Sequence, residues 1–119
     1  MGQVIWTNFA TSELKNIYLY YKIAANISVA LKIKKSIFSS AKLIIKRPLI
    51  GAIEENLIEL KQGHRYVVEG NYKIIYRVIG FDIYITDIFD CRQNPQKMKQ
   101  AVENIRTKSN LIKNNLLEE

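Results

Sequence analysis

The chain has 119 residues, of which 48% are hydrophobic and 24% charged, and this balance excludes a disordered chain and indicates one globular domain over residues 1–119. A single cysteine, Cys91, excludes an intrachain disulfide and fits a reducing cytosol, and the lack of an apolar run near ~20 residues excludes a membrane-spanning helix. The net charge of +7 favours anionic partners, such as nucleic acid or an acidic protein, although solvated helix faces account for such a charge equally well.

The N-terminal residues predict a short strand and then a helix. Residues 3–6 are largely apolar, and Thr7 or Asn8 can cap a helix over about residues 8–25. One apolar stripe at helical spacing supports it, formed by Ala10, Leu14, Ile17 and Tyr21. The tyrosines of this helix are better explained as core and boundary residues than as a platform for stacking bases. Because the start lacks the basic and apolar segments of a secretion signal, we expect a cytoplasmic protein.

A second helix is predicted over about residues 27–47. Its apolar stripe contains Ala30, Ile33, Ile37, Ala41 and Ile44. Lysines fall largely between these positions, so this helix is strongly basic. Pro48 ends it, because proline disfavours helical geometry at the residue before it. With a connection of only a few residues, the two helices should form an antiparallel hairpin.

Beyond residue 60 the hydrophobic period changes from helical to alternating. Three strands are predicted near residues 64–69, 72–79 and 83–90. The breaks between them are short and contain Gly70 and Gly80, which indicates hairpins and an antiparallel meander.

The middle strand presents two different faces. Tyr72, Ile74, Tyr76 and Val78 share an apolar face that should pack on the helical hairpin, whereas Lys73, Ile75 and Arg77 should look outward from an open sheet surface. The residues expected to be mostly buried are Trp6, Leu14, Ile17, Ile33, Ile37, Ile74 and Tyr76.

After Pro95 the chain becomes polar and helix-prone, with a weak stripe of Met98, Ala101, Val102 and Ile105. Residues 98–119 are therefore expected to form a C-terminal helix and tail. The order is strand, two helices, three strands and a helix. It predicts an α+β fold in which an N-terminal strand and a two-helix hairpin pack on a curved antiparallel sheet.

Several segments together resemble a known family over about residues 4–98. They are VIWTNFATSELKNIYLYY, the basic helix that ends in a proline, and RYVVEGNYKIIYRVIGFDIYITDIFDCRQNPQKM. Their order and spacing are similar to those of the RelE/ParE superfamily of toxins from bacterial type II toxin–antitoxin systems. The resemblance implies the fold just described. It also implies an antitoxin whose C-terminal segment wraps the toxin and neutralises it, in a toxin–antitoxin hetero-oligomer.

Two activities occur under this fold, and the fold does not choose between them. RelE-like toxins are enzymes that cleave mRNA on the ribosome, and their basic residues fall near Arg65, Lys73 and Arg92 of this chain. ParE-like toxins are not nucleases and poison DNA gyrase. The residues after Arg92 read QNPQK and lack the tyrosine or histidine that often completes a RelE-like site.

Other candidates for chemistry have simpler explanations. His64, the only histidine, precedes a strand and is interpreted as a surface or turn residue rather than a base. Cys91 has no adjacent base to activate it. Arg65 and Arg77 have a structural alternative, in which they pair with Asp87, Asp90 or Glu69. Lys73 is most simply a solvated strand residue.

We therefore predict a ParE-like toxin that binds and inhibits DNA gyrase, with no catalytic residues, no metal and no cofactor. The alternative is a RelE-like endoribonuclease acting on the ribosome and mRNA, so whether the chain is an enzyme stays open. A plain nucleic-acid-binding or inactive domain is a third possibility, supported by charge alone. The residues expected to bind a partner are Lys32, Lys34, Lys35, Arg77, Leu111 and Ile112.

Overall fold

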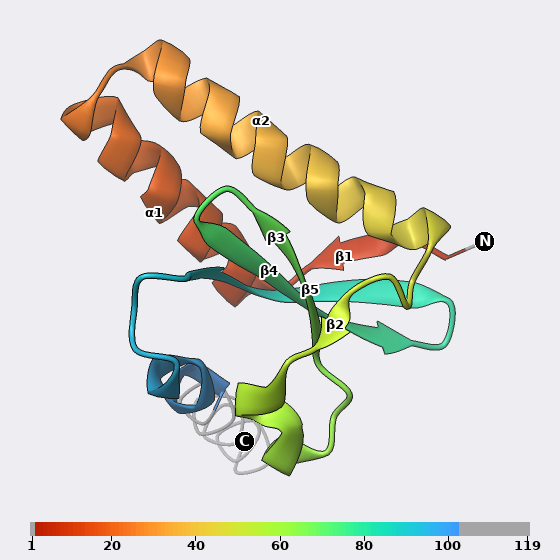
Figure 1. The fold of residues 1–119 in the computed structure, drawn as a ribbon. Coiled ribbons are helices and arrows are strands. Elements are labelled where there is room, and N and C mark those ends of the chain that lie inside the picture. The colour runs from red at the N-terminus through yellow and green to blue at the C-terminus, as the bar shows by residue number, and fades with distance from the viewer. Residues whose placement is uncertain (1, 103–119) are drawn as a thin grey trace, which may run out of the picture.

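Two long helices lie side by side on one face of a five-stranded sheet in the computed structural model, which describes residues 2–102 (Figure 1). Helix α1 spans Asn8–Ala24 and helix α2 spans Ile27–Leu43. The predicted helical hairpin is therefore confirmed. None of the helices in the described part of the chain has the length and apolar character needed to cross a membrane.

Both helices begin at side-chain caps. The Thr7 hydroxyl accepts a hydrogen bond from the Ala10 N–H (3.2 Å), and the Asn26 side chain accepts one from the Val29 N–H (2.9 Å). Each cap satisfies a main-chain donor that would otherwise lack a partner in the first helical turn.

Helix α2 ends earlier than predicted. A 3-10 turn, η1 (Ile44–Lys46), follows it before Pro48. Arg47 has φ −143° and ψ 76°, outside the helical region, as expected for the residue that precedes a proline.

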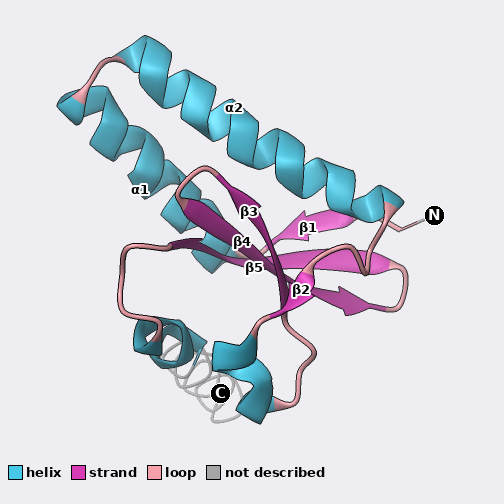
Figure 2. Ribbon diagram, in the orientation of Figure 1, coloured by secondary structure: helices cyan, strands magenta, loops and turns pink. Residues whose placement is uncertain are grey.

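The sheet has the order β1-β5-β4-β3-β2. Its strands are β1 (Val4–Trp6), β2 (Ala52–Ile53), β3 (Arg65–Glu69), β4 (Tyr72–Ile79) and β5 (Asp82–Asp90), coloured magenta in Figure 2. The predicted meander of β3, β4 and β5 is confirmed as antiparallel. Gly70 and Gly80 form its two turns with φ of 59° and 63°, in the left-handed region that glycine adopts readily.

Two features of the sheet differ from the prediction. Strand β1 pairs with β5 in parallel, so the sheet is mixed rather than wholly antiparallel. The helical hairpin and the rest of the sheet lie between these strands in sequence, which provides the long crossover that parallel pairing requires. Strand β2 was not predicted, because two residues are too few to show an alternating pattern.

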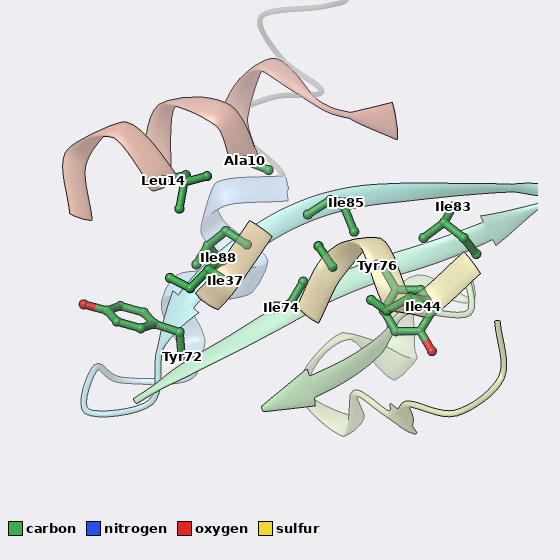
Figure 3. Close-up of a cluster of buried hydrophobic side chains, with 11 residues drawn as sticks. Ala10, Leu14, Ile37, Ile44, Tyr72, Ile74, Tyr76, Ile83, Ile85 and Ile88 are labelled. Carbon is green, nitrogen blue, oxygen red and sulfur yellow. The ribbon is translucent and has the colours of Figure 1, made fainter. Parts of the chain in front are cut away.

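The main core fills the space between the helical hairpin and the sheet (Figure 3). Four residues expected in the core are buried, namely Leu14, Ile37, Ile74 and Tyr76. The other three, Trp6, Ile17 and Ile33, are only partly buried and pack against the margin of this core. Trp6 stacks there on Phe38, with ring centroids 5.8 Å apart.

The opposite face of the sheet is covered, so the prediction of an open surface there is wrong. Ile75 is 0% exposed and belongs to a second buried cluster with Leu57, Phe89 and Met98. Leu57 comes from the 3-10 helix η2 (Glu55–Leu60), and Met98 from a helical segment that begins after Pro95 and is described to residue 102. The apolar side chains on this face need such a cover, because exposing them to water would be unfavourable.

Candidate functional site

Arg65 lies on the same sheet face as the helical hairpin and holds a loop. It pairs across the strands with Tyr76, which places both side chains on one face. The Arg65 guanidinium donates a hydrogen bond to the Gly51 carbonyl (2.8 Å), and the Tyr76 hydroxyl accepts one from the Gly51 N–H (2.9 Å). The same hydroxyl donates to the Pro48 carbonyl (2.8 Å). The two side chains therefore fix the segment that leaves α2, and Arg65 pairs with main-chain carbonyls rather than with the predicted acids.

Gly51 is required at this loop for steric reasons. A Cβ atom at this position would lie 2.6 Å from the Tyr76 hydroxyl and 2.7 Å from the Tyr66 carbonyl oxygen. The second contact is with main chain, which cannot move aside without disturbing β3.

Lys73 lies on the other face and pairs with a buried acid. Its ammonium is 2.9 Å from a carboxylate oxygen of Glu54, a residue that is 1% exposed, and 4.2 Å from the centre of the Tyr66 ring. Burial raises the pKa of Glu54, but hydrogen bonds from Lys73 and Asn56 outweigh burial and hold this pKa below its usual value. Lys73 is thus a structural partner of Glu54 rather than a solvated strand residue.

Arg92 follows β5 and forms a two-point contact with Asp90. The guanidinium donates to both carboxylate oxygens of Asp90, at 2.9 and 2.7 Å. These hydrogen bonds lower the pKa of Asp90. The contact is local, between residues two positions apart, and shapes the turn after the last strand.

The three cations at RelE-like positions therefore do not converge. Arg65 and Lys73 leave the sheet on opposite faces, and each of the three is engaged with a group of this chain. His64, predicted to be a surface or turn residue, precedes β3 outside any helix or strand but is 4% exposed, so the surface position is wrong. Its carbonyl accepts a hydrogen bond from the Glu54 N–H (2.9 Å). Cys91 is exposed. Among the described residues, this arrangement does not assemble a site for acid–base chemistry on a phosphate.

The structure separates the residues predicted to bind a partner. Lys32 and Lys35 line a shallow groove of about 650 Å³ along α2, whose other lining residues include serines 28, 36, 39 and 40. Lys34 lies over the Tyr18 ring of α1, 5.4 Å from its centre. Arg77 lies on the opposite sheet face and donates a hydrogen bond to the Gln62 carbonyl (2.9 Å). Leu111 and Ile112 lie outside the described residues.

A cleft lies between α1 and the end of β5, and the sequence does not predict it. It measures about 490 Å³, and its lining includes Phe9, Glu13, Tyr20, Tyr72 and Asp87. Burial, and secondly the nearby Glu13, raise the pKa of Asp87 to about 7. The signal in the sequence is an aspartate in the middle of an apolar strand, for which the sequence alone indicates only a partner of Arg65 or Arg77.

The comparisons with known proteins agree with this fold. The family model described as "ParE toxin of type II toxin-antitoxin system, parDE" matches residues 4–95. A similar solved structure is that of the chromosomal ParDE toxin–antitoxin system from P. aeruginosa, with 25% identity and a TM-score of 0.64. The alignment covers 76% of this chain and 96% of that chain. The comparison with curated proteins gives no significant match.

Proposed function

This chain belongs to the ParE toxin family of type II toxin–antitoxin systems, and on that premise we propose that it inhibits DNA gyrase by binding the enzyme rather than by cleaving RNA. As a toxin of such a system, it has a cognate antitoxin as its partner. The choice of gyrase is the proposed part, together with the cytoplasm as the place of action, where gyrase works on DNA.

The placement of Arg65 and Lys73 is the observation that carries the proposal. A metal-free ribonuclease needs several cations and a proton donor around one phosphate. Here the two strand cations lie on opposite faces of the sheet, and each already binds a group of this chain. Inhibition by binding requires no such convergence, because shape and surface charge are sufficient to hold a partner.

The basic groove on α2 is evidence that the segment of the antitoxin that contacts it is acidic. Lys32 and Lys35 are exposed there, and neighbouring serine hydroxyls add donors that suit carboxylates. Glu69 is already engaged at the groove, where it accepts a hydrogen bond from Ser40 (2.8 Å). We assign Lys32 and Lys35, among the predicted partner-binding residues, to this contact in a toxin–antitoxin hetero-oligomer.

The test compares the two activities on one preparation. Purified toxin is added to a gyrase supercoiling reaction and, in parallel, to a reconstituted translation mixture in which mRNA cuts are mapped by codon. The proposal predicts loss of supercoiling with intact mRNA. Efficient mRNA cleavage that Arg92→Ala abolishes, with gyrase unaffected, would instead establish the ribonuclease.

A further inference from the structure

The cleft between α1 and the end of β5 combines an apolar wall with a buried carboxyl group, that of Asp87. Phe9, Ile17 and Tyr20 come from α1, and Ile88 and Phe89 from β5. Strand β1 pairs with β5 only at residues 83–85, so the following part of β5 is not covered by β1. The cleft opens at that part of the sheet.

Two carboxylates in this cleft form no ion pair with a lysine or arginine of the described residues. Asp87 is 9% exposed, and Glu13 on α1 is near enough to raise its pKa further. Burial also raises the pKa of Glu13 itself. Among the residues that the structure describes, no lysine or arginine nitrogen lies within 4 Å of either carboxylate.

The other charged and titratable groups of the cleft do not neutralise this pair. Arg92 is held by Asp90, with a shortest contact of 2.7 Å. Lys97 lines the cleft from the C-terminal helical segment but is exposed. Tyr72, from β4, donates its hydroxyl to that of Tyr21 (3.4 Å). Among the described residues, Asp87 and Glu13 thus have no ion-pair partner, in a protein whose net charge is +7.

We propose that this cleft receives a lysine or arginine side chain of the antitoxin, whose ammonium or guanidinium binds Asp87 and Glu13 while its aliphatic stem packs on Phe9 and Ile17. This inference rests on the antitoxin partnership and identifies a contact of opposite sign to the basic groove on α2. Long basic side chains suit such a site, because their stems are apolar and their ends are charged.

A single cation in an otherwise acidic segment would fix how that segment lies on the toxin. Acidic residues of the segment are attracted to Lys32 and Lys35 but repelled by Asp87 and Glu13. A segment that is shifted or reversed would bring a carboxylate to the cleft, and like charges brought together there would be unfavourable. The site therefore contributes to the selection of the cognate antitoxin.

Binding of a cation requires Asp87 in its ionised form. With a pKa of about 7 in the free toxin, Asp87 is mostly protonated at pH 6 and mostly ionised at pH 8. The affinity for the antitoxin should therefore be about tenfold lower at pH 6 than at pH 8, because protons compete with the cation.

The experiment measures the dissociation constant of the purified toxin–antitoxin pair across pH 6–8, with wild-type toxin and the Asp87→Asn variant. We expect Asp87→Asn to bind roughly tenfold or more weakly at pH 8 and to lose most of the pH dependence. Glu13→Gln should move the midpoint of the pH dependence to lower pH, because it removes the charge that hinders ionisation of Asp87. Glu55→Gln, at an exposed carboxylate on η2, is the matched control and should bind like the wild type.

The outcomes separate this inference from the partnership on which it rests. Tight binding by the wild type, with an equal affinity and pH profile for Asp87→Asn, would overturn the assignment of the cleft but not the partnership with the antitoxin. Failure of the wild-type toxin to bind the antitoxin would overturn the partnership and the assignment with it. Thermal unfolding of the free variants checks that a weaker affinity does not come from a misfolded toxin.

Discussion

Arg65 and Lys73 occupy neighbouring strands, yet their side chains lie on opposite faces of the sheet. Arg65 is paired with Tyr76, whereas Lys73 is paired with Val68, and side chains alternate between faces along a strand. Lys73 therefore binds Glu54 under η2, while Arg65 binds the loop that follows α2. These two cations near RelE-like positions stabilise two separate parts of the fold.

Replacing Ile74 with alanine tests the main core. Ile74 is 0% exposed and lies between β4 and the helical hairpin (Figure 3). Ile74→Ala should lower the free energy of unfolding by about 2–5 kcal/mol, because it removes buried apolar atoms and leaves a cavity. Urea denaturation measures the change, with Ile79→Ala as a half-exposed control on the same strand. A loss below about 0.5 kcal/mol, typical of exposed sites, would show that this face is not the core.

Replacing Lys73 with methionine tests the buried ion pair. Glu54 would keep its charge in a buried position without its partner, so we expect Lys73→Met to cost about 1–3 kcal/mol at pH 7. The pKa of Glu54 is lowered by folding, so its charge contributes stability above its usual pKa of 4.5 and loses it as the pH falls through the lower folded value. The cost of Lys73→Met should therefore shrink markedly at pH 3. Denaturation curves at the two pH values measure the difference, and an equal cost at both would contradict this role of the pair.

Asp87→Asn should make the free toxin more stable at neutral and alkaline pH. The pKa of Asp87 is raised from 3.8 to about 7, so folding favours the protonated form. This contribution to stability is complete below pH 3.8 and is lost as the pH rises towards 7. The variant should exceed the wild type by about 1–3 kcal/mol at pH 8 and match it at pH 3. Thermal unfolding over this range provides the comparison, and a variant that is less stable at pH 8 would show that the charge is compensated within the fold.

Charge reversal on α2 tests the groove assigned to the antitoxin. Lys32→Glu combined with Lys35→Glu should slow association with the antitoxin about tenfold or more at low salt, because it removes electrostatic steering. The wild-type rate should fall as salt rises, measured by stopped flow. Lys22→Glu combined with Lys42→Glu changes the net charge equally, at exposed lysines that do not line the groove. If both double variants slow association by the same factor, net charge rather than the groove controls the encounter.

The regular parts of the fold could be predicted because their signals are local. Thr7 and Asn26 are strong caps, and the helical stripes and the alternation around Ile74 each extend over several residues. Strand β2 has two residues, and the direction of β1 relative to β5 depends on the path of the whole chain. Neither leaves a periodic pattern that a sequence can reveal.

The roles of the charged residues depend on tertiary contacts and were harder to predict. Arg65 and Arg77 donate to main-chain carbonyls of loops. Every residue has such a carbonyl, so the sequence does not show which one an arginine will bind. The sequence predicts Lys73 in solvent because it does not reveal the cover over this sheet face. That cover comes from short segments around Leu57 and Met98, which lie far apart in sequence. The burial of Asp87 cannot be predicted from the sequence for the same reason. Its burial and its proximity to Glu13 arise only when α1 packs on β5.

Poisoning of gyrase by this toxin is tested most directly by the amount of plasmid DNA trapped in a covalent complex with gyrase. Supercoiled plasmid, purified gyrase and ATP are incubated with the toxin, then treated with detergent and protease, and linear DNA is quantified. We expect linear DNA to increase with toxin concentration, Arg92→Ala toxin to act like the wild type, and prior addition of the antitoxin to prevent the effect. Unchanged supercoiling and no linear DNA at excess toxin, from a preparation that cleaves mRNA on translating ribosomes, would contradict poisoning of gyrase.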